Sequence, residues 1–266
     1  MLEAVFERAR SAQRCAFIPY VMAGDPDVQT TLSVLEALTA LGADAIELGI
    51  PYGDPLADGP TIAAAGQRAL AVGTTIDSVL ELVRRHRDRG GAPIVLFTYF
   101  NPIYRYGVAR FAANAATAGA SAAIVPDIAL EESGQLLGAL ATSGLDMPLL
   151  VAPSTKPARA RRIAAASTGF VYVVSRLGVT GATAQPSTKA LDDQIRGLRT
   201  LTEKPLAVGF GISSPEHVRA VATLADGFIV GSALIDSFAG THGDEAVVRV
   251  RAFVEPLVAA AAYVGV

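Results

Sequence analysis

Three carboxylates lie close together in the first quarter of the chain, within the stretch 47–61. Glu47 stands inside an apolar, strand-like run from Ala45 to Ile50, whereas Asp54 and Asp58 follow in a segment punctuated by glycine and proline. A carboxylate is costly to bury without a partner. An acid at the end of a strand, followed by acids on the next loop, is the arrangement by which an α/β barrel positions its chemistry.

Glu47 has the residue pattern of a side chain that points into a barrel. Alternate side chains of a barrel strand point inward, so Ala45 and Gly49 would share its side. Small neighbours leave room there, and apolar walls that restrict water should raise the pKa of the carboxyl group. Such a group can both give and take a proton near neutral pH. The alternative is a structural glutamate that an arginine or backbone amides hold in place.

Asp54 and Asp58 also have a structural alternative, because Asp–Pro and Asp–Gly pairs are typical of turns and helix caps. We expect one of the two to serve in that way. Two aspartates in one short loop, directly after an inward glutamate, favour a second functional carboxylate.

Two glycine-rich segments, 209–212 and 230–233, follow the last two strand-like runs. Backbone N–H groups of such loops, with a short helix N-terminus, make the phosphate site of many (β/α)8 enzymes, and the Ser232 hydroxyl can add a hydrogen bond. Left-handed turns are the alternative reason for these glycines. The place of both segments in the chain favours a phosphorylated ligand. No Gly-x-x-x-x-Gly-Lys motif is present, which disfavours nucleotide hydrolysis.

A long stretch, 175–189, follows the sixth strand-like run and contains Gly178 and Gly181. At the catalytic face it would act as a lid, and the alternative is an ordinary solvated connection. Large apolar and aromatic residues near the strand ends would form either barrel filler or a flat slot for an aromatic ligand. These residues are Phe97, Tyr99, Ile124, Tyr172, Phe210 and Ile229.

Eight short apolar runs alternate with stretches of helical periodicity along the chain. The alternation predicts α/β architecture with a parallel, eight-stranded (β/α)8 barrel, and no linker divides residues 1–266, which we interpret as a single domain. An open doubly wound sheet is the alternative, weakened because no Gly-x-Gly-x-x-Gly motif follows the first run. The expected strands are Ala16–Met22, Ala45–Ile50, Ile94–Thr98, Ala122–Val125, Pro148–Ala152, Phe170–Ser175, Leu206–Phe210 and Gly227–Val230.

The composition narrows the classes of function. The net charge is −3 and no basic block occurs, so binding to nucleic acid or to a membrane surface lacks an electrostatic basis. The single cysteine, Cys15, excludes an internal disulfide, and the three histidines lack the spacing of metal ligands. No signal pattern or membrane-spanning run is found, so we expect a soluble, cytoplasmic protein without a metal.

These segments together resemble the tryptophan synthase alpha chain family over nearly the whole chain. The signature runs from Glu47 to Ile62, and its two carboxylates, Glu47 and Asp58, stand 11 positions apart (58 − 47). The resemblance continues through Pro19–Pro26, Tyr99–Pro102, Pro126–Asp127, Ala152–Pro153, Ser175–Arg176, Gly178–Gly181, Gly209–Ile212 and Val230–Ala233. It implies a barrel with extra helices at the N-terminus and after the eighth strand, which cleaves indole-3-glycerol phosphate to indole and glyceraldehyde 3-phosphate.

The resemblance also implies roles for individual residues. Glu47 would be the general acid and base at indole C3 and the glycerol hydroxyl, Asp58 would hydrogen-bond the indole N–H, and Tyr172 would line the site beside them. The phosphate would lie against Gly181, Gly211, Gly231 and Ser232. Indole would lie among Tyr20, Phe97, Ile124, Thr180, Phe210 and Ile229. Asp54, Asn101, Pro102 and Arg176 would lie on loops that face a partner chain.

That implied partner is a β chain that carries pyridoxal phosphate and receives indole within an α2β2 heterotetramer, while this chain has no cofactor of its own. Three positions depart from the family pattern: Gly53 replaces a serine, Ala129 a proline, and Leu177 a small or polar residue. Because Gly53 and Ala129 would lie near the partner, we hypothesise that the isolated chain is a slow lyase until the partner orders its loops. The alternatives are a stand-alone lyase that releases free indole, a non-catalytic barrel that regulates a partner, and another phosphate-binding barrel.

Overall fold

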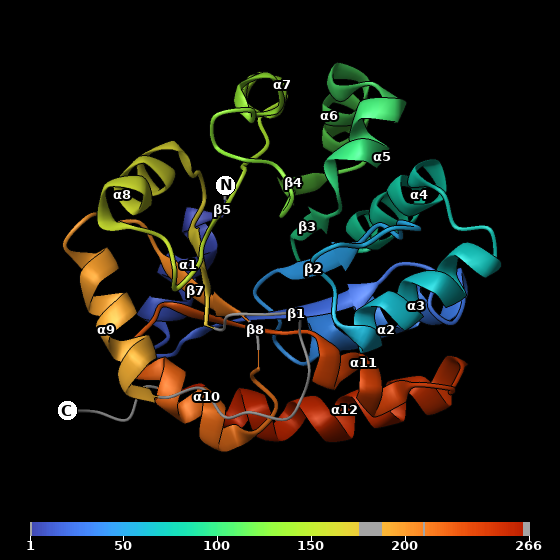
Figure 1. Cartoon of the computed structure of the whole chain (residues 1–266). Helices are drawn as coiled ribbons and strands as arrows, with labels where there is room; N and C mark the ends of the chain where they lie inside the picture. The colour runs from blue at the N-terminus through green and yellow to red at the C-terminus, as the bar shows by residue number, and fades with distance from the viewer. Residues whose placement is uncertain (1, 176–187, 210, 263–266) are drawn as a thin grey trace.

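Eight parallel strands surrounded by helices form the protein (Figure 1). The computed structural model describes residues 2–175, 188–209 and 211–262. The strands lie within two residues of the expected bounds; the largest difference is that the fourth begins at Ala120 instead of Ala122. They are β1 (Ala16–Met22), β2 (Ile46–Gly49), β3 (Ile94–Phe97), β4 (Ala120–Ile124), β5 (Leu149–Val151), β6 (Val171–Val174), β7 (Leu206–Gly209) and β8 (Gly227–Val230).

The strand order is that of a barrel, β4-β3-β2-β1-β8-β7-β6-β5. The two end strands approach each other through a parallel bridge between Ala122 and Asp146, just before β5. The Ala123 N–H donates to the Asp146 carbonyl at 3.0 Å, and the Asp146 N–H donates to the Ser121 carbonyl at 3.0 Å. The sheet is therefore almost closed, and the expected (β/α)8 fold is confirmed.

Most connections between strands contain one helix, and those after β2, β3 and β8 contain two. The second helix after β8 agrees with the expected extra helix, but the pairs after β2 and β3 were not expected. The Thr75–Ser78 capping box starts the second helix of one pair, and Gly107, at φ +97°, ends the first helix of the other. The helices are α1 (Glu3–Ser11), α2 (Val28–Ala40), α3 (Pro60–Ala71), α4 (Ile76–Asp88), α5 (Phe100–Tyr106), α6 (Val108–Thr117), α7 (Gly134–Thr142), α8 (Pro157–Ala166), α9 (Thr188–Arg199), α10 (Pro215–Ala222), α11 (Ser232–Phe238) and α12 (Gly243–Ala259).

Two apolar cores lie on the two sides of the sheet. The outer core, between sheet and helices, contains Ile46 and Leu48 of β2, whereas Ala45 belongs to the inner core within the barrel. This alternation places Glu47 on the inner side, as predicted. Because the inner side is narrow and apolar, a polar group there is separated from water unless it lies near an open end.

The N-terminal helix α1 closes one end of the barrel. Its Phe6 belongs to the inner core and lies 5.4 Å from the ring of Phe170, measured between ring centroids. A Cβ on Gly227 of β8 would lie 2.7 Å from the Phe6 ring, so the helix approaches the strand closely. A ligand can therefore reach the interior only from the end at which the strands terminate. In the described part of the chain, no helix is both long enough and apolar enough to cross a membrane.

Candidate active site

Glu47 is a buried carboxyl group for which the described residues provide no charge partner. Its side chain is 1% exposed, and its Oε1 atom has no hydrogen-bond partner among the described residues. Burial raises the pKa of Glu47 to about 8, because water no longer stabilises the charged form. Among the described residues no arginine or backbone amide is recorded on this group. The Glu47 carboxyl group can therefore be protonated at neutral pH and can release its proton at a pH close to neutral.

Asp58 lies on the loop between β2 and α3 and is half-buried. Burial raises its pKa, and hydrogen bonding from the Tyr99 hydroxyl opposes that rise. The loop is also fixed through its backbone, since the Ala57 N–H donates to the Tyr99 hydroxyl at 3.0 Å. Helix α3 begins directly afterwards, with Pro60 in its first turn, where the missing N–H costs nothing.

Two tyrosines, Tyr20 and Tyr172, interact electrostatically with the carboxyl groups of the site. Tyr20 on β1 is the register partner of Glu47. The pKa of Tyr20 is raised well above its usual range, first by burial and then by the charges of Asp58 and Glu47. The pKa of Tyr172 on β6 is raised by burial, then by Glu47 and Tyr20. Tyr20 thus lies within electrostatic reach of both carboxyl groups, and Tyr172 lies within reach of Glu47 and Tyr20.

Glycines on the neighbouring strands leave room for the side chains of both tyrosines inside the barrel. A Cβ on Gly49 would lie 2.2 Å from the Tyr20 hydroxyl oxygen, and one on Gly209 would lie 2.2 Å from that of Tyr172. Both distances are impossible for real atoms. The Tyr20 ring also makes an edge contact with Phe97, with 5.6 Å between centroids. On the inner side of the barrel, aromatic rings therefore pack against glycines of neighbouring strands.

Two further members of the predicted apolar slot belong to the same inner core, which does not include Tyr99. They are Ile124 at the end of β4 and Ile229 on β8. Ile62 of α3, which was not predicted, packs against this core from the first turn after the Asp58 loop. The walls of the expected slot therefore come from β1, β3, β4, β6 and β8, with α3 beside them.

The residues predicted for the phosphate lie at the ends of β7 and β8. Gly211 has φ +86°, which favours glycine for conformational reasons. Gly231 precedes α11, and Ser232 begins it. A Cβ on Gly231 would make ordinary contacts with Tyr20, at 3.7 Å, and with Ile62, at 3.8 Å, so described side chains lie directly over this glycine. Of the remaining residues singled out in the sequence, Arg176, Leu177, Thr180, Gly181 and Phe210 lie outside the described residues.

Of the residues predicted to lie on loops that face a partner, Asp54 lies on the β2 loop, but Asn101 and Pro102 lie in the first turn of helix α5. Asp54 and Asn101 are exposed, and Pro102 is partly exposed. The Asn101 side-chain amide donates to the Tyr52 hydroxyl at 3.0 Å. Gly53 and Ala129, the two departures on this side, are also exposed. A Cβ on Gly53 would meet no described atom within 4 Å, so no steric contact requires a glycine there.

Sequence reasoning missed the part that Tyr99 and Tyr52 play in holding the Asp58 loop. The sequence marks Tyr99 only as an aromatic residue near a strand end, and it gives Tyr52 no distinct role. The two rings are 5.5 Å apart between centroids. The position of Tyr99 directly after the strand next to that of Glu47 was a usable signal, since neighbouring parallel strands end side by side.

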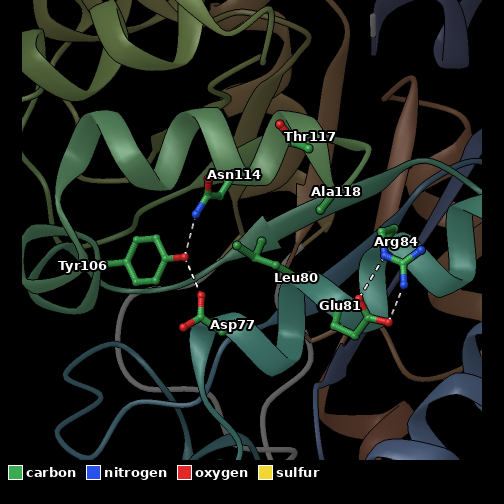
Figure 2. A pocket seen from close by; sticks show the side chains of 8 residues that line it. All are labelled: Asp77, Leu80, Glu81, Arg84, Tyr106, Asn114, Thr117 and Ala118. Carbon is green, nitrogen blue, oxygen red and sulfur yellow. Dashed lines mark hydrogen bonds and ion pairs between the residues drawn. The ribbon is translucent and has the colours of Figure 1, made fainter.

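A groove of about 240 Å³ lies elsewhere, on the outside between α4 and α6 (Figure 2). In it Tyr106 donates to Asp77 and accepts from the Asn114 amide at 2.8 Å. These polar groups satisfy one another, and the groove contains none of the predicted site residues. The described ranges of the chain contain no cluster of three or more His, Cys, Asp or Glu side chains suited to a metal ion.

Comparisons with known proteins agree on one family. The family profile for the tryptophan synthase alpha chain matches residues 6–262. The tryptophan synthase alpha chain of Thermosynechococcus vestitus is 47% identical over 253 residues, which cover 95% of this chain and 94% of that protein. That of Acaryochloris marina is 50% identical over 232 residues, covering 87% and 86%. A chain of Mycobacterium tuberculosis tryptophan synthase superposes with a TM-score of 0.89 at 38% identity, covering 98% of both chains.

Proposed function

The chain belongs to the tryptophan synthase alpha chain family, lyases that act on indole-3-glycerol phosphate, and we propose that Glu47 and Asp58 perform this cleavage. The observation that carries the proposal is the buried Glu47 carboxyl group, whose pKa burial raises to about 8 and whose register partner Tyr20 packs against Phe97. The single (β/α)8 domain of residues 1–266 would act in the cytoplasm.

The reaction needs one proton donor and one anionic acceptor. Glu47 in its protonated form gives its proton to C3 of the indole ring, which creates a cationic indolenine. The Asp58 carboxylate accepts a hydrogen bond from the ring N–H and stabilises that positive charge. Glu47, now ionised, takes the proton of the glycerol hydroxyl on the neighbouring carbon. The C–C bond then breaks, its electron pair returns to the ring, and indole and glyceraldehyde 3-phosphate result.

The remaining predicted residues would bind the substrate. Tyr172 lines the site beside Glu47, and the rings of Tyr20 and Phe97 with Ile124 and Ile229 bind the indole plane, together with Thr180 and Phe210. Gly211, Gly231 and Ser232 bind the phosphate, together with Gly181. The position of Gly231 and Ser232 at the end of β8 and the start of α11 supports this assignment, because a phosphate needs close approach to backbone N–H groups.

The partner would be a β chain that carries pyridoxal phosphate, with which this chain forms an α2β2 heterotetramer and to which it passes indole. The acid–base steps above use only side chains of this chain, so no cofactor of its own is required. Leu56 on the Asp58 loop is 74% exposed and Tyr104 on α5 is 66% exposed. These exposed apolar residues, on the Asp58 loop and on α5, support a docking surface there, to which Asp54, Asn101 and Pro102 would contribute; Arg176 is assigned to the same surface by the resemblance alone.

Glu47→Gln tests the proposal with indole-3-glycerol phosphate as substrate and indole release as the measurement. Loss of the proton donor should lower kcat by about 1,000-fold, while binding of glycerol 3-phosphate should stay unchanged. Glu255→Gln, on the exposed face of α12, is the matched control and should keep full activity. Equal rates in wild type and Glu47→Gln would contradict the assignment.

Addition of a purified β chain separates the coupled enzyme from a stand-alone lyase. We expect the partner to increase the rate of indole release by ordering the Asp58 loop. An unchanged rate, with full activity in the isolated chain, would favour the stand-alone alternative.

A further inference from the structure

Tyr99 occupies a position from which it can control the loop that carries Asp58. It follows β3, precedes α5, and is only 3% exposed. Its hydroxyl oxygen accepts a hydrogen bond from the Ala57 N–H at 3.0 Å. The peptide unit that links Leu56 to Ala57, directly before Asp58, is thus attached at one point to a residue of the neighbouring strand connection.

The hydrogen-bonding capacity of a phenol makes this contact directional. The hydroxyl has one proton to donate and an oxygen that can accept. Because the oxygen accepts from Ala57, the proton remains available for the carboxyl group of Asp58, on which it acts as a donor. Donation requires an acceptor, so this arrangement favours the ionised carboxylate over the protonated acid.

Two further contacts keep Tyr99 in place. Its ring lies 5.5 Å from that of Tyr52, whose hydroxyl accepts from the Asn101 amide at 3.0 Å. On the other side, Asp127 after β4 accepts from the Phe100 N–H at 2.9 Å. The segment 99–101 is thus attached both to the β2 loop and to the β4 loop.

The loop itself offers little internal restraint. Gly53 is exposed, and Leu56 projects into solvent. Among its described backbone N–H groups, that of Ala57 has an acceptor from another segment, in Tyr99. A glycine in such a loop also has more conformational freedom to lose on ordering.

We propose that Tyr99 is a positioning residue, which holds the backbone that leads into Asp58, and with it the Asp58 carboxylate, in place before substrate or partner arrives. The inference deepens the proposed function and rests on it for its kinetic test. It assigns to this chain a means of ordering its own catalytic loop, on which partner binding would then build.

Tyr99→Phe removes the hydroxyl and keeps the ring. We expect kcat for cleavage of indole-3-glycerol phosphate to fall by about tenfold, with a smaller change in KM. Since the lost bond favours the carboxylate, the pKa of Asp58 should rise, and the acid side of the kcat profile should move to higher pH. Tyr106→Phe, which removes a hydroxyl that donates to Asp77 in the outer groove, is the matched control and should leave the profile unchanged.

Two measurements separate failure of this inference from failure of the proposed function. NMR titration of ¹³C-labelled aspartate carboxyl groups, with Asp58→Asn to identify the signal, reports the Asp58 pKa without any substrate. An identical titration in wild type and Tyr99→Phe would overturn the inference even if both cleave the substrate. Absence of cleavage by the wild type would overturn the proposed function, while a shifted titration would still support the role of Tyr99.

Hydrogen exchange in the wild type needs no variant and applies even if Tyr99→Phe is poorly folded. The Ala57 amide should exchange at least tenfold more slowly than the Gly53 amide of the same loop, because only the former is bonded to Tyr99. Equal exchange rates would overturn the inference.

Discussion

Glu47 and Asp58 are two carboxyl groups whose pKa values are raised by the same cause, burial, but which the protein holds in different ways. Glu47 is fixed by a strand within the sheet, and its Oε1 atom has no described hydrogen-bond partner. Asp58 lies on a loop, is only half-buried, and has the Tyr99 hydroxyl as a donor. The strand thus supplies a neutral acid, and the loop supplies a group kept closer to its ionised form.

The difference shows how one site can contain two carboxyl groups with distinct tasks. A proton donor benefits from the absence of hydrogen-bond donors, because nothing then favours its charged form. A group that stabilises a cation needs the opposite environment. The protein separates these environments by placing one carboxyl group on a rigid element and the other on a loop that a neighbouring segment supports.

After the loss of activity already expected for Glu47→Gln, the next largest effect on this comparison is expected for Asp58→Asn. This substitution keeps a hydrogen-bond acceptor but removes the charge. We expect kcat to fall by about 100-fold, because the amide stabilises cationic indolenine poorly, and this loss should be smaller than that for Glu47→Gln. Single-turnover indole release measures both. A greater loss in Asp58→Asn than in Glu47→Gln would reverse the assigned tasks.

The strand-borne half of this site could be predicted from sequence, because its signals are local. The alternation of Ala45, Glu47 and Gly49 with bulky residues fixes which side chains point inward. The inward orientation of Glu47 and its raised pKa were both predicted and are confirmed. β4 was placed two residues late because its first four residues, 120–123, include no β-branched residue that would indicate a strand.

The loop-borne half could be predicted only in part, because its restraints come from residues distant in the sequence. The bond from Ala57 to Tyr99 spans 42 positions, and the bond from Asn101 to Tyr52 spans 49. No periodicity links such residues; they meet because β2 and β3 are neighbours in the sheet. Similarly, Thr61 of α3 donates to Asp236 of α11 at 3.2 Å, a contact that the sequence pattern does not reveal.

A second prediction concerns folding stability. As pH rises, burial of the Glu47 carboxyl group should lower the free energy of unfolding, and burial of Asp58 should lower it less. The native Glu47 pKa of about 8 exceeds the ordinary value of 4.5, so the native state binds more protons between these pH values and the wild type loses stability as pH rises. The free energy of unfolding of Glu47→Gln relative to wild type should therefore grow by roughly 3 kcal/mol from pH 5 to pH 8.

Chemical denaturation at several pH values measures this difference. Glu255→Gln, at an exposed site, should show no such dependence on pH. Asp58→Asn should show a weaker dependence of the same sign, since the Tyr99 hydroxyl opposes the effect of burial on its pKa. A constant difference between Glu47→Gln and wild type would mean that Glu47 is already ionised in the native protein at pH 5.

The smallest expected effect is the alkaline decline of activity, which tests whether the two carboxyl groups are tuned independently. Glu47 must begin the reaction protonated, so kcat should fall as pH rises through about 8, by about tenfold between pH 7 and pH 9. Burial is the cause of the raised Glu47 pKa, with no contribution from the charge of Asp58. The alkaline decline should therefore keep its midpoint in Asp58→Asn, despite the lower rate. A midpoint that moves in Asp58→Asn would show that the carboxyl groups titrate as a coupled pair, and the division between strand and loop would then no longer describe the site.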